Sequence, residues 1–216
     1  MSFAQKIDHT LLSKSHTHAE LDSFLSDAEE YGTNVCVPPS RVEYVAENLS
    51  GSEIATVVGF PLGYNTTEIK VDEARLVVEN GATEIDMACN ISSLKSGDYD
   101  AFRRDVERVV NGTDVITKAI IETGLLSDGE KRRAAKLVVE AGADYVKTCT
   151  GFTEGKATVE DVELIKDVIG DEAKIKASGS ISDYETAQAM LEAGADRIGA
   201  SSGDEIVRGY RRKQSD

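Results

Sequence analysis

The chain lacks the features that mark membrane, disulfide-stabilised and nucleotide-binding proteins. No run within its 216 residues approaches the roughly 20 apolar residues that a membrane-spanning helix needs. Three cysteines without Cys-x-x-Cys spacing favour reduced thiols over a disulfide framework. A G-x-G-x-x-G fingerprint and a Walker A motif are both missing. The N-terminal segment has no signal-peptide pattern, so we expect a cytoplasmic protein.

Basic residues are also scarce, with 24 against 39 acidic residues and a formal net charge of −15. A nucleic-acid surface needs basic patches, so we expect neither a nucleic-acid partner nor a membrane partner. The acidic surface is compatible with adaptation to a high-salt cytoplasm and equally with an ordinary acidic enzyme. The length and the 40% hydrophobic content fit one domain over residues 1–216.

One unit recurs four times along the chain: a helix pattern that ends at a glycine, then a short turn and a β-branched run. The four glycines are Gly32, Gly81, Gly142 and Gly194. Glycine suits this position because it adopts the left-handed backbone conformation that commonly ends a helix. Helix starts are marked by hydroxyl-x-x-Glu capping boxes, which satisfy free backbone N–H groups. These boxes begin at Thr17, Ser127 and Ser182.

Eight short runs read as strands, most of them separated by a helix pattern. They are 6–9, 34–37, 54–58, 83–87, 115–121, 145–148, 175–177 and 197–199. This alternation predicts a parallel sheet, and eight strands predict a closed (β/α)₈ TIM barrel, an α/β fold. A doubly wound open sheet is the alternative, weakened by the missing nucleotide motifs. The charged segment 208–216 is expected to be a loose tail.

Two lysines lie inside consecutive strands, Lys147 in YVKTC at 145–149 and Lys176 in KIKA at 174–177. A single strand lysine more often faces solvent. The pairing, the small residues after each run and the barrel favour burial here. Neighbouring parallel strands lie roughly 5 Å apart. Two ammonium groups that close repel, which lowers the pKa of one lysine and favours a free amine for Schiff-base chemistry.

Side-chain alternation places further charged groups inside the barrel. Asp86 and Lys118 are expected to point inward from the fourth and fifth strands, although packing alone gives no reason for them. Lys118 is either a partner of Asp86 or a substrate contact. Asp8 and Thr10 end the first strand and either touch substrate or close the barrel.

Glycine- and serine-rich loops follow the seventh and eighth strands, where barrels commonly bind phosphate. They are Ser178-Gly179-Ser180 and Gly199-Ala200-Ser201-Ser202-Gly203. Glycine lets the backbone approach an anion, and serine hydroxyls add hydrogen-bond donors. Together the two loops predict a phosphate site.

Eight ordered segments resemble the deoxyribose-phosphate aldolases, a family of class I aldolases. The segments are IDHTLL at 7–12, VCVPPSRV at 35–42, VVGFPLG at 57–63, EIDMACN at 84–90, KAIIETGLL at 118–126, YVKTCTGF at 145–152, IKASGSIS at 175–182 and RIGASSG at 197–203. The resemblance implies a (β/α)₈ barrel. It also implies reversible cleavage of 2-deoxy-D-ribose 5-phosphate to D-glyceraldehyde 3-phosphate and acetaldehyde, without a metal or organic cofactor.

The resemblance also implies roles for particular residues. The Schiff-base lysine falls on Lys147, the second lysine that lowers its pKa on Lys176, and the acid–base aspartate on Asp86. Phosphate contacts fall on Gly151, Gly179, Ser180, Gly199, Ser201 and Ser202. Family members commonly form dimers or tetramers, so a homo-oligomer is expected.

The sequence departs from the family pattern in two places. Many members have a second glycine and then a basic residue where this chain has Ser180 and Ser182, which puts phosphate affinity in doubt. Some members use a C-terminal tyrosine in proton transfer, and Tyr210 is the nearest tyrosine to that position here. Other hypotheses are a class I aldolase for a ketose phosphate, a barrel isomerase, and a non-catalytic sugar-phosphate-binding protein.

Overall fold

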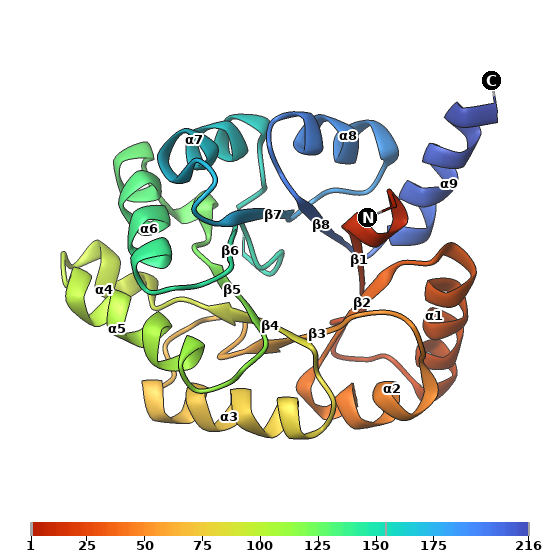
Figure 1. The fold of residues 1–216 in the computed structure, drawn as a ribbon, viewed down its shortest axis with the longest axis horizontal. Coiled ribbons are helices and arrows are strands. Elements are labelled where there is room, and N and C mark those ends of the chain that lie inside the picture. Colours follow the sequence, from red (N-terminus) through yellow and green to blue (C-terminus); the bar gives the residue numbers. More distant parts are fainter. Residues whose placement is uncertain (1, 154, 216) are drawn as a thin grey trace.

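A computed structural model describes residues 2–153 and 155–215 of the chain. Over this part, eight parallel strands form a closed barrel in chain order, with β8 pairing to β1 (Figure 1). The strands are β1 (Ile7–Thr10), β2 (Asn34–Val37), β3 (Ile54–Val58), β4 (Glu84–Ala88), β5 (Ile116–Ile120), β6 (Tyr145–Lys147), β7 (Lys174–Ser178) and β8 (Arg197–Ala200). The (β/α)₈ prediction is confirmed, and the open-sheet alternative is wrong because β1 and β8 pair.

Helices surround the strands as an outer ring (Figure 1). They are α1 (His18–Tyr31), α2 (Val42–Asn48), α3 (Thr67–Glu79), α4 (Ile91–Lys95), α5 (Tyr99–Val110), α6 (Asp128–Glu140), α7 (Val159–Ile169), α8 (Tyr184–Glu192) and α9 (Gly203–Ser215). The described part of the chain also contains three short 3₁₀ helices, η1 (Ala4–Lys6), η2 (Pro39–Arg41) and η3 (Thr123–Leu125). A large apolar cluster fills the space between strands and helices and includes Ile85, Val146 and Ile175, which alternate with inward-facing residues.

Local sequence signals set most helix boundaries. The glycines of the four repeated units all have positive φ, between 72° and 115°. Thr17 and Ser127 form the predicted capping boxes with Glu20 and Glu130. The third predicted box is wrong. Helix α8 begins one residue later than predicted, because the Asp183 carboxylate caps it by accepting from the backbone N–H of Thr186 at 2.8 Å.

The tail prediction for residues 208–216 is also wrong. Helix α9 continues to Ser215 and buries Ile206 and Val207 against the barrel. Its charged residues are therefore the outer face of an amphipathic helix. Asp216 lies outside the described residues.

Polar and aromatic contacts hold the second half of α9 in place. The Arg208 Nε donates to the Tyr31 hydroxyl at 2.7 Å. The Tyr210 ring stacks on Phe3, with centroids 4.2 Å apart. These contacts tie the last helix to α1 and to the start of the chain.

Among the described residues, no helix is long and apolar enough to cross a membrane.

Candidate active site

A carboxylate on β4 gathers three lysines from the next three strands. The Asp86 Oδ2 accepts from the Nζ of Lys147 and from the Nζ of Lys176, both at 2.7 Å. The Asp86 Oδ1 accepts from the Lys118 Nζ at 2.9 Å. The parallel register explains the meeting, because Asp86 pairs with Lys118 and Lys147 pairs with Lys176 across neighbouring strands. The predicted inward residues therefore do lie together.

Two residues that the sequence argument did not single out complete the cluster. The Arg197 guanidinium on β8 contacts an Asp8 oxygen at 2.7 Å and a Glu84 oxygen at 3.2 Å. Glu84 also contacts Lys118, and Asp8 also contacts Lys176. Strand alternation could have found both, because Glu84 lies two residues before Asp86 and Arg197 lies two residues before Gly199.

The charges inside the barrel do not balance. The buried cations are Lys118, Lys147, Lys176 and Arg197, and the buried carboxylates that they contact are Asp8, Glu84 and Asp86. Within the described part of the interior, one positive charge is thus left over if every group is ionised. Lys147 contacts one of these carboxylates, whereas each other cation contacts two. Lys147 is therefore the cation of this interior cluster with the least carboxylate compensation.

Burial and charge act in opposite directions on the pKa values in this cluster. Burial raises the pKa of Asp86, but the three lysines outweigh it and bring that pKa well below its ordinary value. Burial lowers the pKa of Lys176, yet Asp8 and Asp86 more than compensate and raise it overall. The simple picture of two repelling ammonium groups is therefore incomplete, because Asp86 bridges Lys147 and Lys176 and Lys176 is held as a cation.

A cavity of about 420 Å³, the lysine cavity, opens at the carboxyl ends of β6, β7, β8 and β1. Of the buried cations named above, Lys147 is the one that lines it. Five of the predicted phosphate contacts also line it, namely Gly151, Gly179, Ser180, Gly199 and Ser201. Thr10 is in the wall as well. Asp8, Asp86, Lys118 and Lys176 lie beneath the cavity, and Ser202 is outside its lining.

The loops around the cavity need unusual backbone conformations. Gly151 and Gly179 have φ of 79° and 109°. A side chain at Gly199 would place its Cβ 2.9 Å from the Lys176 Cε, so glycine lets β8 pack directly over that lysine. Ser180 has φ of 61°, the left-handed region that favours glycine. The position where the family often has a second glycine is therefore one where serine is strained.

We expect Ser180→Gly to raise the free energy of unfolding by about 0.5–1 kcal/mol, because it removes the Cβ from a left-handed residue. Urea unfolding of the two proteins measures the change. Ser202→Gly is the control, since Ser202 is not among the described residues with positive φ. Equal behaviour of the two variants would contradict the strain at Ser180.

Acid should destabilise the fold through the buried carboxylates. Burial raises the pKa of Asp8, but Lys176, Lys118 and Arg197 outweigh it and bring it from 3.8 to about 2. The folded-state pKa is the lower one, so this stability is present above pH 4 and is lost as the pH falls toward 2. The contribution is about 2 kcal/mol. Urea unfolding between pH 5 and pH 2.5 should show a shallower pH dependence for Asp8→Asn than for wild type, and equal slopes would contradict this.

Two further features of the described residues concern metal ligands and Tyr210. Over residues 2–153 and 155–215, no group of three or more His, Cys, Asp or Glu side chains is arranged to hold a metal ion.

Tyr210 packs against Phe3 and Tyr184, and it is not part of the lysine cavity lining. The role of a C-terminal tyrosine in proton transfer is therefore not supported by the position of Tyr210.

The fold and the cavity together define a class of (β/α)₈ barrel with a lysine cluster beneath the carboxyl ends of its strands. Within that class, a model of the DeoC/LacD family aldolases matches residues 3–209. The chain belongs to this family, which confirms the resemblance seen in the sequence.

Individual relatives agree with the family assignment. A deoxyribose-phosphate aldolase of Staphylococcus carnosus is 49% identical over 213 residues, covering 97% of each chain. The solved structure of "QR15, an Aldolase" is 39% identical with a TM-score of 0.96, covering 100% of this chain and 99% of that one. A tetrameric deoxyribose phosphate aldolase from Aeropyrum pernix is 31% identical with a TM-score of 0.88, covering 96% and 90%.

Proposed function

We propose that the protein is a deoxyribose-phosphate aldolase that cleaves 2-deoxy-D-ribose 5-phosphate reversibly, through an imine on Lys147. The observation that carries the proposal is the position of Lys147. It lines the cavity, has the fewest carboxylate contacts of the four cations inside the barrel named above, and shares the cavity with the glycine-rich loops after β7 and β8. The relatives that bear this name cover nearly the whole chain.

The first half of the reaction forms the imine. The neutral Lys147 amine attacks the C1 aldehyde of the open-chain sugar and gives a carbinolamine. Loss of water from the carbinolamine leaves an iminium ion, which attracts electrons from the neighbouring bond. Asp86 accepts a hydrogen bond from Lys147 and is the proton carrier nearest to this nitrogen.

The second half breaks the carbon–carbon bond. A base removes the C3 hydroxyl proton, the C2–C3 bond breaks, and its electron pair moves to the iminium nitrogen. D-Glyceraldehyde 3-phosphate leaves, and an enamine of acetaldehyde stays on Lys147. Protonation of the enamine carbon and hydrolysis then release acetaldehyde. Asp86, with Lys176 and a water molecule, supplies these proton transfers, which contribute typically 10²–10⁴-fold in rate.

The phosphate end gives the direct test of substrate class. Backbone N–H groups and hydroxyls are available in the lining of the cavity that also contains Lys147, from Gly151, Gly179, Ser180, Gly199 and Ser201. Binding energy from the phosphate should position C1, so deoxyribose should show a lower kcat as well as a higher KM than its 5-phosphate. We expect kcat/KM to fall by at least about 10²-fold. Cleavage of the two sugars is measured by coupled assays for the products, D-glyceraldehyde 3-phosphate from the phosphate and glyceraldehyde from the free sugar. Equal kcat/KM values for deoxyribose and its 5-phosphate would reject the phosphate site.

The donor substrate, which is the carbonyl compound that forms the imine in the synthetic direction, distinguishes the main proposal from a ketose-phosphate aldolase. Both enzymes form an imine, but in the synthetic direction one accepts acetaldehyde and the other accepts dihydroxyacetone phosphate. We propose acetaldehyde as the donor. Membership in an aldolase family argues against the isomerase and the non-catalytic binding protein. A homo-oligomer is also proposed, supported by the tetrameric relative from Aeropyrum pernix.

A further inference from the structure

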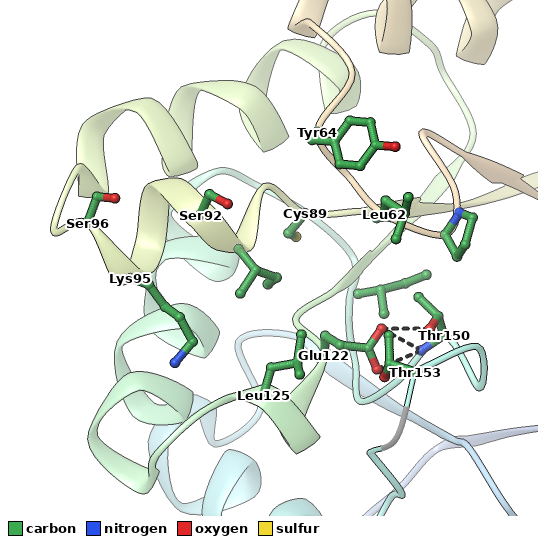
Figure 2. Close-up of a pocket in the computed structure, with 14 residues that line it drawn as sticks. Leu62, Tyr64, Cys89, Ser92, Lys95, Ser96, Glu122, Leu125, Thr150 and Thr153 are labelled. Carbon is green, nitrogen blue, oxygen red and sulfur yellow. Dashed lines mark hydrogen bonds between the residues drawn. The ribbon is translucent and has the colours of Figure 1, made fainter.

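A second cavity, the side cavity, adjoins the lysine cavity above the ends of β4 and β5. Its volume is about 450 Å³, and its walls are mostly apolar, with Leu62, Ile91 and Leu125 among them. Thr150 lines both cavities, and Glu122 lines the side cavity next to it. Figure 2 shows the Glu122 carboxylate and Thr150 joined by hydrogen bonds at one wall. The two residues therefore stand at the boundary between the cavities.

Glu122 is held in a conformation that its residue type disfavours. Its φ and ψ are 52° and 63°, which is left-handed. A residue with a side chain pays about 1–2 kcal/mol to adopt this conformation. The carboxylate is also buried, with 3% of the residue exposed, and among the described residues it forms no ion pair. A left-handed backbone and a buried carboxyl group without an ion pair among the described residues indicate a functional constraint at this position.

The Glu122 carboxylate accepts hydrogen bonds from the loop that follows β6, the strand that carries Lys147. It accepts from the Thr150 backbone N–H at 3.2 Å and from the Thr150 hydroxyl at 2.6 Å. The Thr150 hydroxyl oxygen in turn accepts from the Phe152 N–H at 3.1 Å. Thr123 extends the β5–β6 pairing by donating its N–H to the Thr148 carbonyl at 3.0 Å. The segment at 122–123 thus fixes residues 148–152, beginning one residue after Lys147.

We infer that Glu122 is a positioning residue for the aldol reaction and acts through Thr150. This inference rests on the proposed function. By fixing Thr150, Glu122 sets the Gly151 backbone that faces the substrate phosphate. Loss of the carboxylate should therefore misplace the phosphate relative to the amine, while leaving the amine itself in place.

The test compares two readouts in the same variants. One is kcat and KM for 2-deoxyribose 5-phosphate. The other is the rate at which acetaldehyde and borohydride form a reduced adduct on Lys147, which does not need the phosphate. Glu122→Gln should lower kcat/KM for the sugar phosphate by about 10–10²-fold, because a displacement near 1 Å costs this much. Adduct formation from acetaldehyde should fall far less.

Further variants separate the kinetic effect of losing the carboxylate from the effects of backbone conformation and of overall stability. Glu122→Gly relieves the left-handed strain but removes the hydrogen bonds, so it should stay folded and show the same kinetic defect. Thr150→Val should reproduce the defect, whereas Thr150→Ser, which keeps the hydroxyl, should restore wild-type kinetics. If Glu122 acts through Thr150, the double variant Glu122→Gln/Thr150→Val should lose no more than the worse single variant.

The outcomes are distinguishable. Wild-type kcat/KM in both Glu122 variants, or an equal loss of both readouts together with the melting temperature, would overturn the positioning role. A wild-type protein that neither cleaves the sugar phosphate nor forms the adduct would reject the proposed function itself, and the inference with it.

Discussion

Lys147→Met should lower the rate of 2-deoxyribose 5-phosphate cleavage by at least about 10⁴-fold, as expected for loss of a covalent nucleophile. Methionine is an unbranched side chain one atom shorter than lysine, and it cannot form an imine. The same change removes one of the four basic groups inside the barrel, and Asp86 keeps its contacts to Lys118 and Lys176. The melting temperature should therefore stay the same or rise, which is unusual for a substitution at a buried ion pair.

Lys174→Met is the matched control for this variant. Lys174 lies two residues before Lys176 on β7, but it is exposed and takes no part in the buried cluster. Its replacement should leave the cleavage rate within about twofold, as for most surface substitutions. Retained activity in Lys147→Met, or a comparable loss in Lys174→Met, would contradict the assignment of the nucleophile.

Asp86→Asn should damage both stability and activity. The carboxylate accepts from three buried lysines, and an amide cannot compensate their charge. Removing one member of a buried charge network costs about 3–5 kcal/mol, and loss of the proton carrier costs typically 10²–10⁴-fold in rate. The measurements are urea unfolding and kcat at pH 7.

The pH dependence of this variant gives a sharper criterion. Without Asp86, Lys118 and Lys176 lose one of the carboxylates that raise their pKa, so burial should lower the folded-state pKa values of these two lysines relative to wild type. The folded variant then binds fewer protons than folded wild type, and stability should rise with pH between 7 and 9.5 by more than in wild type. An Asp86→Asn protein as stable as wild type at pH 7, with the same pH dependence, would show that Asp86 does not hold the cluster together.

Much of the site could be predicted from the sequence because it follows from regular geometry. Strand alternation fixes which side chains point inward, and the parallel order of strands brings Lys147 next to Lys176 and Asp86 next to Lys118. The same rule, applied one step further down the strands, would have found Glu84 and Arg197. Strand alternation could not predict which of these side chains contact one another, because the bridging position of Asp86 depends on side-chain conformation.

Local competition and tertiary contacts explain the predictions that were wrong. Asp183 and Ser182 are both good capping residues, and the Asp183 carboxylate is the one that caps α8. The last helix reads as a charged tail because its stabilising partners, Tyr31 and Phe3, lie far away in the chain. The left-handed conformation of Glu122 has no sequence signal, since it occurs at a residue type that rarely adopts it.

The most direct test of the account is borohydride trapping with acetaldehyde, followed by intact mass and peptide mapping at low and high salt. The account predicts a single reduced two-carbon adduct on Lys147 and none on Lys118 or Lys176, which lie beneath the cavity. A folded protein that forms no adduct at either salt concentration, or that is modified on Lys176 in place of Lys147, would contradict it.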